Sequence, residues 1–186
     1  MNGYRALVLG ASAGGVEALL HLLPRLDGLD LPILLVQHLP QDVPSHLAEI
    51  FATRLQRPVR EAEDKEPLQP STLYVAPPGY HLCVEADFSL SLSREAAVNF
   101  SRPSIDLLFE SAAAVFGHQL IGALLTGANE DGAAGLRRIA ERGGLTLVQD
   151  PQEAVCPAMP QAALKLFTPA HVLSLDAMAD FLLRLE

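Results

Sequence analysis

The chain has 186 residues, of which 49% are hydrophobic and 19% are charged, and this balance excludes a largely disordered protein. The 22 acidic residues outnumber the 13 Lys and Arg, which gives a formal net charge of −9. This charge argues against DNA or RNA as the main ligand, because binding to a phosphate backbone needs clustered cations. The length fits one domain, residues 1–186, with a single core.

Two further features bear on where the protein works. The N-terminal residues lack the basic segment and long apolar run of a signal peptide, and no apolar run reaches the roughly 18–20 residues of a membrane span. The two cysteines, Cys83 and Cys156, are far apart and form no paired framework, which suits a reducing compartment. We therefore expect a cytoplasmic protein with no membrane insertion.

Strand and helix signals alternate along the chain. Short buried runs predict strands at residues 5–9, 33–37, 119–125, 145–149 and 172–175. Apolar residues at helical spacing predict helices at residues 15–23, 45–55, 104–116, 133–142, 161–167 and 178–185. The second of these helices is expected to bury Leu47, Ile50, Phe51 and Leu55 on one side, and the arginines at 54, 57 and 60 to form a solvated face.

The middle of the chain has a different pattern. Prolines at 67, 70, 77 and 78 break it into short pieces, and residues 81–84 and 89–92 predict a small antiparallel hairpin around Asp87. We expect this stretch to be an insertion near the functional site. The whole chain is predicted to be an α/β protein, a three-layer α/β/α domain with a mostly parallel, doubly wound sheet.

Three predicted strands end near reactive side chains, namely Ser12, His38 and Asp131. Ligands of open parallel sheets bind beyond the carboxyl ends of the strands, so these residues are expected to meet there as nucleophile, base and orienting carboxylate. Each also has a simpler interpretation. Ser12 and Asp131 could cap the helices that follow them, and His38 could be an ordinary polar residue at a strand end.

The segment from Gly10 to Gly15 contains only glycine, alanine and serine, so it predicts a tight strand-to-helix turn. The amide of Ala13 at this helix start could donate to a developing oxyanion. A phosphate-binding loop is an alternative. The dinucleotide-binding form of this loop is disfavoured, because the glycine spacing is wrong and the second strand ends in Gln37 and His38 rather than in an acidic residue. The lysine-containing P-loop motif of nucleotide-binding proteins is absent from the sequence.

Other reactive groups form weaker candidates. Cys156 could be a nucleophile with His81, His118 or His171, but it has no small-residue turn and no neighbouring base, so a buried or half-buried thiol is expected. The six histidines are scattered without metal-ligand spacing. We therefore predict no metal site and no cofactor.

Several short motifs occur in one order along the chain: residues 10–15 (GASAGG), 37–40 (QHLP), 74–79 (YVAPPG) with His81, 102–106 (RPSID), 125–127 (LTG), 131–133 (DGA), 149–150 (QD) and 159–160 (MP). Over nearly its whole length the chain resembles the catalytic domain of the CheB family of chemotaxis protein-glutamate methylesterases. The resemblance implies the same fold class and places the family's nucleophile, base and carboxylate at Ser12, His38 and Asp131.

The family acts on γ-methyl glutamyl esters in the cytoplasmic helices of chemoreceptors and releases methanol, and some members also deamidate glutamine there. The resemblance therefore implies receptor helices as partners, a γ-glutamyl acyl-enzyme on Ser12, and oxyanion donation by the amides of Ala13 and Ala128. Two alternatives stay open: a binding or regulatory module of the same fold with little turnover, and hydrolysis of another ester or amide.

The chain departs from the family pattern at several positions. Residues 127–130 read GANE where the family usually has Gly-Met-Gly and a variable residue, Ser101 stands where a histidine is common, and Ala158 replaces a usual glycine. Many family members carry an N-terminal receiver domain, whereas here the first motif begins within ten residues of Met1. We therefore expect constitutive activity or control by a separate receiver or regulatory protein.

Overall fold

The computed structural model describes residues 3–39 and 44–185. The strands are β1 (Ala6–Ala11), β2 (Ile33–Gln37), β3 (Val59–Glu61), β4 (Leu73–Val75), β5 (His81–Val84), β6 (Leu90–Ser93), β7 (Leu120–Leu124), β8 (Leu145–Gln149) and β9 (His171–Leu173). The α-helices are α1 (Gly15–Leu22), α2 (Leu47–Ala52), α3 (Ile105–Phe116), α4 (Ala133–Glu141), α5 (Ala158–Leu166) and α6 (Leu175–Leu183), with short 3-10 turns η1 (Leu23–Leu26) and η2 (Gly117–Gln119).

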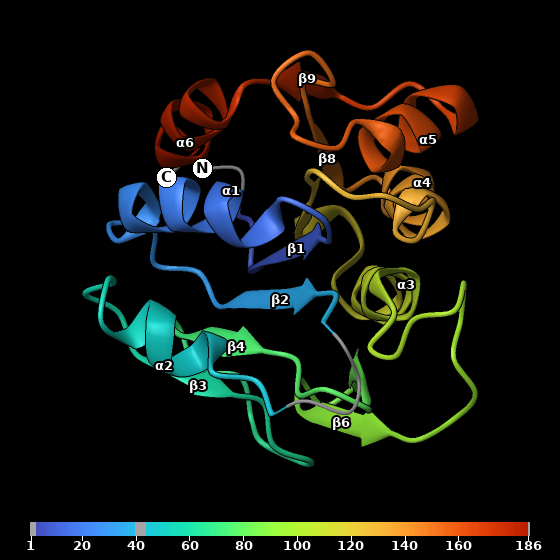
Figure 1. Ribbon diagram of the computed structural model, residues 1–186. Helices are drawn as coiled ribbons and strands as arrows, with labels where there is room; N and C mark the ends of the chain where they lie inside the picture. The colour runs from blue at the N-terminus through green and yellow to red at the C-terminus, as the bar shows by residue number, and fades with distance from the viewer. Residues whose placement is uncertain (1–2, 40–43, 186) are drawn as a thin grey trace.

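A seven-stranded parallel sheet runs in the order β3-β4-β2-β1-β7-β8-β9 through the middle of the molecule (Figure 1). The strands β1, β2 and β7 are buried along their whole length, as expected for continuous apolar runs covered on both faces. β1 pairs with β2 on one side and with β7 on the other. The chain therefore reverses its direction of winding at β1, and ligands of such sheets bind at this switch point.

The sheet separates two apolar cores. One core joins α1, α2 and α6 to side chains such as Leu9 and Leu35, and the other joins α3, α4, α5 and the hairpin to side chains such as Val8 and Leu34. Consecutive residues of one strand thus point to opposite layers, as the two-residue period of a strand requires. In Figure 1 the first group of helices lies to the left of the sheet and the second to the right. The expected three-layer α/β/α class is confirmed.

The predicted hairpin is confirmed, with β5 and β6 paired antiparallel from His81 opposite Ser93 to Val84 opposite Leu90. It packs against α3 through buried apolar residues that include Leu82 and Leu90. Because α3 begins at the carboxyl edge of the sheet, the hairpin supports the site without joining the main sheet.

The sequence interpretation was wrong in four local respects. β3 and β4 extend the parallel sheet, although the expectation for this region was short broken pieces, because three-residue strands carry too little periodicity to be seen. The helix predicted from 45 spans only Leu47–Ala52, and Ile50 is 40% exposed rather than buried. β9 begins one residue earlier than expected, and α5 and α6 each begin three residues earlier.

Arg57 is the fourth correction. It was expected on a solvated face, yet it is 6% exposed. Its guanidinium donates to the carbonyls of Leu26 and Leu29 at 2.5 and 2.6 Å, so it closes the end of η1 from within the fold.

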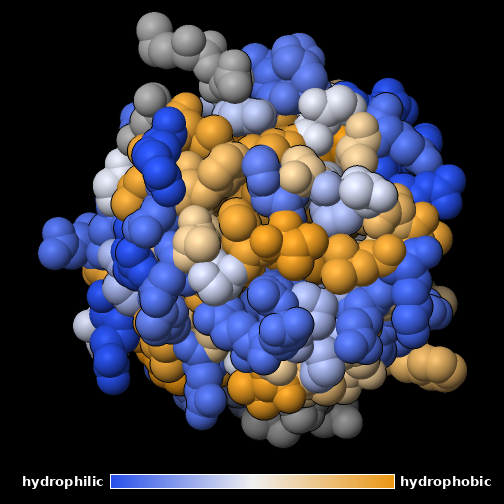
Figure 2. All heavy atoms as spheres, turned by 90° about the horizontal axis from the view of Figure 1, so that it is seen from above, coloured by the Kyte–Doolittle hydropathy of each residue, from blue (hydrophilic) through white to orange (hydrophobic). Residues whose placement is uncertain are grey.

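The sheet edge at β9 is only partly covered, and Val172 on this strand is 44% exposed. Seen from above, a band of hydrophobic side chains crosses the middle of this face and hydrophilic side chains surround it (Figure 2). Every helix in the described ranges is too short or too polar to cross a bilayer.

Candidate functional site

Ser12 lies directly beyond β1, at the point where the chain turns into α1. Its amide donates to the carbonyl of Thr126 at 2.9 Å, which ties the turn to the end of β7. Its carbonyl accepts from the Gly15 amide at 2.8 Å and closes the turn. The N-cap of α1 is Gly14, with φ of 76° and no side-chain cap, so the alternative that Ser12 serves as the helix cap is wrong. The hydroxyl of Ser12 makes no hydrogen bond to any described residue, and the residue is partly exposed.

His38 lies beyond β2, next to Ser12 across the two strands. Ala11 and Gln37 are paired in the parallel register, and the His38 amide donates to the carbonyl of Ala11 at 3.0 Å. Ser12 and His38 are therefore the next residues on strands that run about 4.8 Å apart. The imidazole is 11% exposed and its Nε2 lies 2.7 Å from Oδ2 of Asp131.

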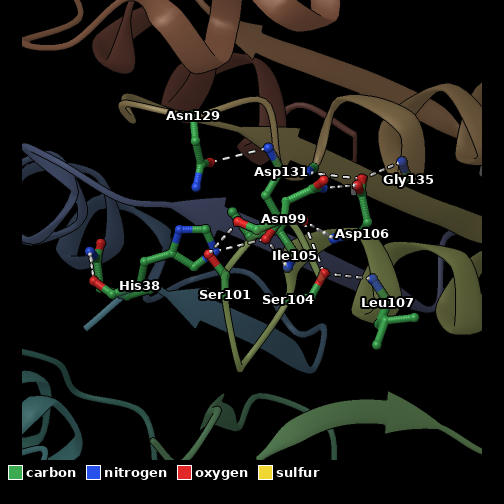
Figure 3. Close-up of polar contacts among 12 residues, drawn as sticks. His38, Asn99, Ser101, Ser104, Ile105, Asp106, Leu107, Asn129, Asp131 and Gly135 are labelled. Atoms are coloured by element: carbon green, nitrogen blue, oxygen red, sulfur yellow. Dashed lines mark hydrogen bonds and ion pairs between the residues drawn. The ribbon is translucent and has the colours of Figure 1, made fainter. Parts of the chain in front are cut away.

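Asp131 is fully buried and comes from the loop between β7 and α4 (Figure 3). Its carboxylate accepts four hydrogen bonds: from His38 Nε2 and the Ile105 amide at 2.7 Å, from the Ser104 hydroxyl at 2.9 Å, and from the Asp106 amide at 3.1 Å. The alternative that it caps its own helix is wrong, since the N-cap of α4 is Gly132 without a side-chain bond. Asp131 instead receives the first amides of α3, which fix its orientation toward His38.

Asp106 reciprocates this arrangement from the first turn of α3. Its Oδ1 accepts from the Gly132 and Gly135 amides at 2.9 and 2.7 Å, at the start of α4. Its Oδ2 accepts from the Asn99 side chain at 3.1 Å. Each of the two helices is thus capped by a carboxylate from the other, and this exchange holds the Asp131 loop against α3 (Figure 3).

The two carboxyl groups differ in acidity. Burial raises the pKa of Asp131, but the hydrogen bonds from His38 and from the Ile105 and Asp106 amides outweigh burial, and its pKa lies below the usual value. Burial raises the pKa of Asp106 to about 6, with the Gly135 amide opposing the rise and the Asp131 charge adding to it. Asp131 is therefore the ionised partner of His38 at neutral pH. An ionised acceptor fixes the ring proton on Nε2 and leaves Nδ1 free to accept a proton.

Gln37 joins the two strand ends that carry Ser12 and His38. Its Nε2 donates to the carbonyl of Ser12 at 2.9 Å and to that of His38 at 3.0 Å. Its Oε1 is buried, has no hydrogen-bond partner among the described residues, and lies over Gly15, where an added Cβ would come within 2.1 Å of it. Glycine is therefore required at 15 so that the Gln37 amide can bridge the two carbonyls.

Thr126 forms the wall on the other side of Ser12. Its hydroxyl donates to the carbonyl of Ala13 at 2.9 Å and accepts from the amide of Cys156 at 2.9 Å. Its own amide donates to Gln149 Oε1 at 2.9 Å. The nucleophile turn is thus tied to β7, β8 and the segment before α5.

Two amides expected to bind an oxyanion, those of Ala13 and Ala128, have no acceptor among the described residues. Both residues are exposed at the rim of the site. The loop that departs from the family pattern keeps negative φ at Ala128 and Asn129, so its path does not depend on glycine there. Asn129 Oδ1 accepts from the Asp131 amide at 3.1 Å and stabilises the turn before the carboxylate.

The competing groups are placed elsewhere. His81 is fully buried, accepts from the Ser104 amide at 3.1 Å and lies 3.0 Å from the Ala96 carbonyl. His171 packs on Phe181. No contact in the described part of the chain joins Cys156 to a histidine, and its thiol is half-buried as expected. Within the described ranges no three His, Cys, Asp or Glu residues are grouped to hold a metal ion.

The sequence reasoning missed the roles of Gln37, Ser104, Asp106 and Thr126 as supports of the site. A partial signal existed for Ser104, which was predicted to begin α3 and does cap it through the Leu107 amide. The bonds of Asp106 to the Gly132 and Gly135 amides, and that of the Thr126 hydroxyl to the Cys156 amide, join residues 26 to 30 positions apart, so no local pattern could reveal them.

Comparison with known proteins gives consistent matches. A family model described as CheB methylesterase matches residues 7–182. A Leptospira interrogans protein, provisionally named a protein-glutamate methylesterase/protein-glutamine glutaminase, is 45% identical over 184 residues, which are 98% of this chain and 95% of that protein. The chain is similar to the crystal structure of the Thermotoga maritima CheB methylesterase catalytic domain, with a TM-score of 0.93, 28% identity, and coverage of 98% of this chain and 99% of that one.

A second type of relative is longer. A protein-glutamate methylesterase/protein-glutamine glutaminase of Nocardioides sp. is 39% identical over 187 residues, which are 99% of this chain but 51% of that protein. The chain therefore spans about half of this relative and nearly all of the Leptospira protein.

Proposed function

Since the chain belongs to the CheB methylesterase family, we propose that it is a serine hydrolase that removes γ-methyl groups from glutamyl esters in the cytoplasmic helices of chemoreceptors. Residues 1–186 act as one catalytic domain in this proposal. The observation that carries it is the 2.7 Å contact between His38 and the buried Asp131, at the strand end next to Ser12.

In the proposed acylation step, Nδ1 of His38 takes the hydroxyl proton of Ser12 as Oγ attacks the ester carbonyl carbon. The negative charge passes to the carbonyl oxygen, which in this proposal accepts hydrogen bonds from the amides of Ala13 and Ala128. Asp131 stabilises the imidazolium that forms. Collapse of the intermediate breaks the bond to methoxide, which takes the proton from His38 and leaves as methanol.

The resulting γ-glutamyl ester on Ser12 is cleared by the same groups. His38 removes a proton from water, the hydroxide attacks the acyl carbon, and Ser12 recovers its proton as glutamate is released. A glutamine side chain can follow the same route with ammonia as the leaving group. Both activities appear in the names of relatives, so we include deamidation in the proposal.

The alternative of a binding module without turnover predicts an unreactive Ser12. A fluorophosphonate probe distinguishes the two, since it labels only a serine that a base activates. We expect labelling of the native chain at Ser12, and absence of label would favour the binding module.

The decisive variant is Ser12→Ala. We expect methanol release from methylated receptors to fall by about 10³-fold or more, since a triad without its nucleophile loses nearly all covalent catalysis. Ser93→Ala is the matched control, because the hydroxyl of this hairpin serine hydrogen-bonds only to the Glu95 amide among the described residues. Methanol and ammonia are measured together, and undiminished release by Ser12→Ala would contradict the assignment.

A further inference from the structure

The two most exposed large apolar side chains in the described part of the chain are Phe100, at 101% exposed, and Val155, at 73%. The other exposed large apolar residues range from 37% to 44%. Single exposed apolar residues are ordinary on protein surfaces. The positions of Phe100 and Val155 are unusual, because each residue belongs to a segment that is hydrogen-bonded to the candidate site.

Val155 lies over the turn that carries Ser12. A Cβ added to Gly14, two residues after Ser12, would come within 2.7 Å of the Val155 Cβ. The next residue, Cys156, bonds through its amide to Thr126, which also holds the Ser12 turn. Val155 is therefore a fixed apolar rim on one side of the nucleophile.

Phe100 lies at the tip of a tight turn in the segment before α3. Val98 and Ser101 exchange two backbone hydrogen bonds of 3.0 and 2.8 Å across it. Asn99 and Phe100 have φ of 48° and 62°, a conformation that asparagine tolerates but a bulky aromatic residue rarely adopts. The turn is anchored by the bond from Asn99 to Asp106.

This anchor connects the turn to the Asp131 loop, since Asp106 also binds the Gly132 amide. In Figure 1 the segment between β6 and α3 extends outward on the right, the direction in which β1 and β2 point. A cavity of about 710 Å³ lies beside it, with Val98 and Asn99 on one wall and Leu166 of α5 on another. The turn therefore holds an aromatic side chain in water, beside a hollow whose wall includes Asp106 and Glu130, next to the Asp131 loop.

We propose that Phe100 and Val155 form the two sides of a docking surface for the polypeptide that carries the glutamyl ester. Nothing in the described chain covers either side chain, and backbone strain of this kind is retained where a site needs it. An exposed aromatic residue gains most by entering an apolar pocket of a partner. The inference rests on the proposed function, and it adds that substrate choice depends on apolar residues flanking the modified glutamate.

The test uses the full chain with Phe100→Ala, Val155→Ala and the double variant. Two quantities are measured: kcat/KM for methanol release from methylated receptor cytoplasmic fragments, and kcat/KM for p-nitrophenyl acetate, which is too small to reach both rim residues. We expect the ratio of the first to the second to fall about ten-fold for Phe100→Ala and further for the double variant. Phe100→Tyr should restore most of the ratio, because it keeps the aromatic ring.

Val172→Ala is the matched control, an exposed apolar residue on β9 at the sheet edge, and its ratio should equal that of the native chain. Binding of the receptor fragment to each rim variant is also measured in the Ser12→Ala background, where turnover does not interfere, and should weaken about ten-fold. Native binding and an unchanged ratio in Phe100→Ala would overturn the docking surface. Absence of methanol release by the native chain would instead overturn the proposed function, while the binding measurements still decide the docking surface.

Discussion

The pKa values of two buried carboxyl groups at the site, Asp106 and Asp131, are shifted in opposite directions. Burial raises the pKa of Asp131, but the hydrogen bonds that it accepts lower the pKa by more. Asp131 therefore remains charged opposite His38. Burial raises the pKa of Asp106 to about 6, since its donors are too few to offset the burial and the charge of Asp131 is close. The difference allows one carboxylate to serve catalysis while the other holds helix ends together.

Asp106→Asn tests this difference through stability. A carboxyl whose pKa is raised on folding favours the folded state below its unfolded pKa, and that contribution is lost as pH rises through about 6. The asparagine keeps an acceptor for the Gly132 and Gly135 amides and carries no charge. We expect the unfolding free energy of the variant, relative to the native chain, to rise by about 1 kcal/mol between pH 5 and pH 7.5.

Urea unfolding at the two pH values measures this change. Asp87→Asn is the contrasting variant: hydrogen bonds from Ser89 lower the pKa of Asp87, so this carboxyl is ionised in both the folded and the unfolded chain at the two pH values, and the relative stability should not change between them. A pH-independent difference for Asp106→Asn would show that its charge does not oppose folding.

At the scale of elements, the site depends on how strand ends and helix starts are joined. β1 and β2 deliver Ser12 and His38 side by side through their register, and the Gln37 amide fixes both carbonyls. The starts of α3 and α4 exchange carboxylates and place Asp131. Hydrogen bonds between the ends of strands and the starts of helices therefore fix the positions of Ser12, His38 and Asp131.

Gly15→Ala tests the first of these junctions. The new Cβ would lie 2.1 Å from Gln37 Oε1, so the amide must move and its bonds to Ser12 and His38 weaken. We expect kcat for methanol release to fall about ten-fold or more with a small change in KM, since an error of about 1 Å in the reacting groups has effects of this order.

Gly28→Ala is the matched control, because its added Cβ would meet nothing closer than Leu183 Cδ2 at 3.8 Å. We expect Gly28→Ala to leave kcat for methanol release at the native value. Equal losses in the two variants would mean that replacement of glycine by alanine in general, and not the Gln37 contact, disturbs the enzyme.

The whole molecule has two cores, and only one of them supports the Asp131 network. Phe109 of α3 is fully buried in the core of α3, α4 and α5, and its Cβ lies against Gly135. Leu182 of α6 is fully buried in the opposite core, with α1 and α2. Both cores therefore stabilise the fold, but only the core that contains α3 packs against the residues that position Asp131.

Phe109→Ala and Leu182→Ala separate stability from catalysis. Both should lower the unfolding free energy, by about 3–5 kcal/mol for the phenylalanine and about 2–5 kcal/mol for the leucine. Kinetics at a temperature where both variants are folded should show a kcat loss of about ten-fold in Phe109→Ala only, because α3 carries the partners of Asp131. An equal loss of kcat in Leu182→Ala would contradict this division.

The sequence by itself determined the fold class, the central strands and the places of Ser12, His38 and Asp131 after strands, because apolar periodicity and the alternation of strand and helix signals are local patterns. Its proposed residue roles at the site stay predictions that the Ser12→Ala experiment tests. Only the tertiary structure decided that Asp131 serves α3 rather than its own helix, that β3 and β4 join the sheet, and that Arg57 is buried. These features depend on contacts between residues at least 14 positions apart along the chain, and no pattern of neighbouring residues encodes such contacts.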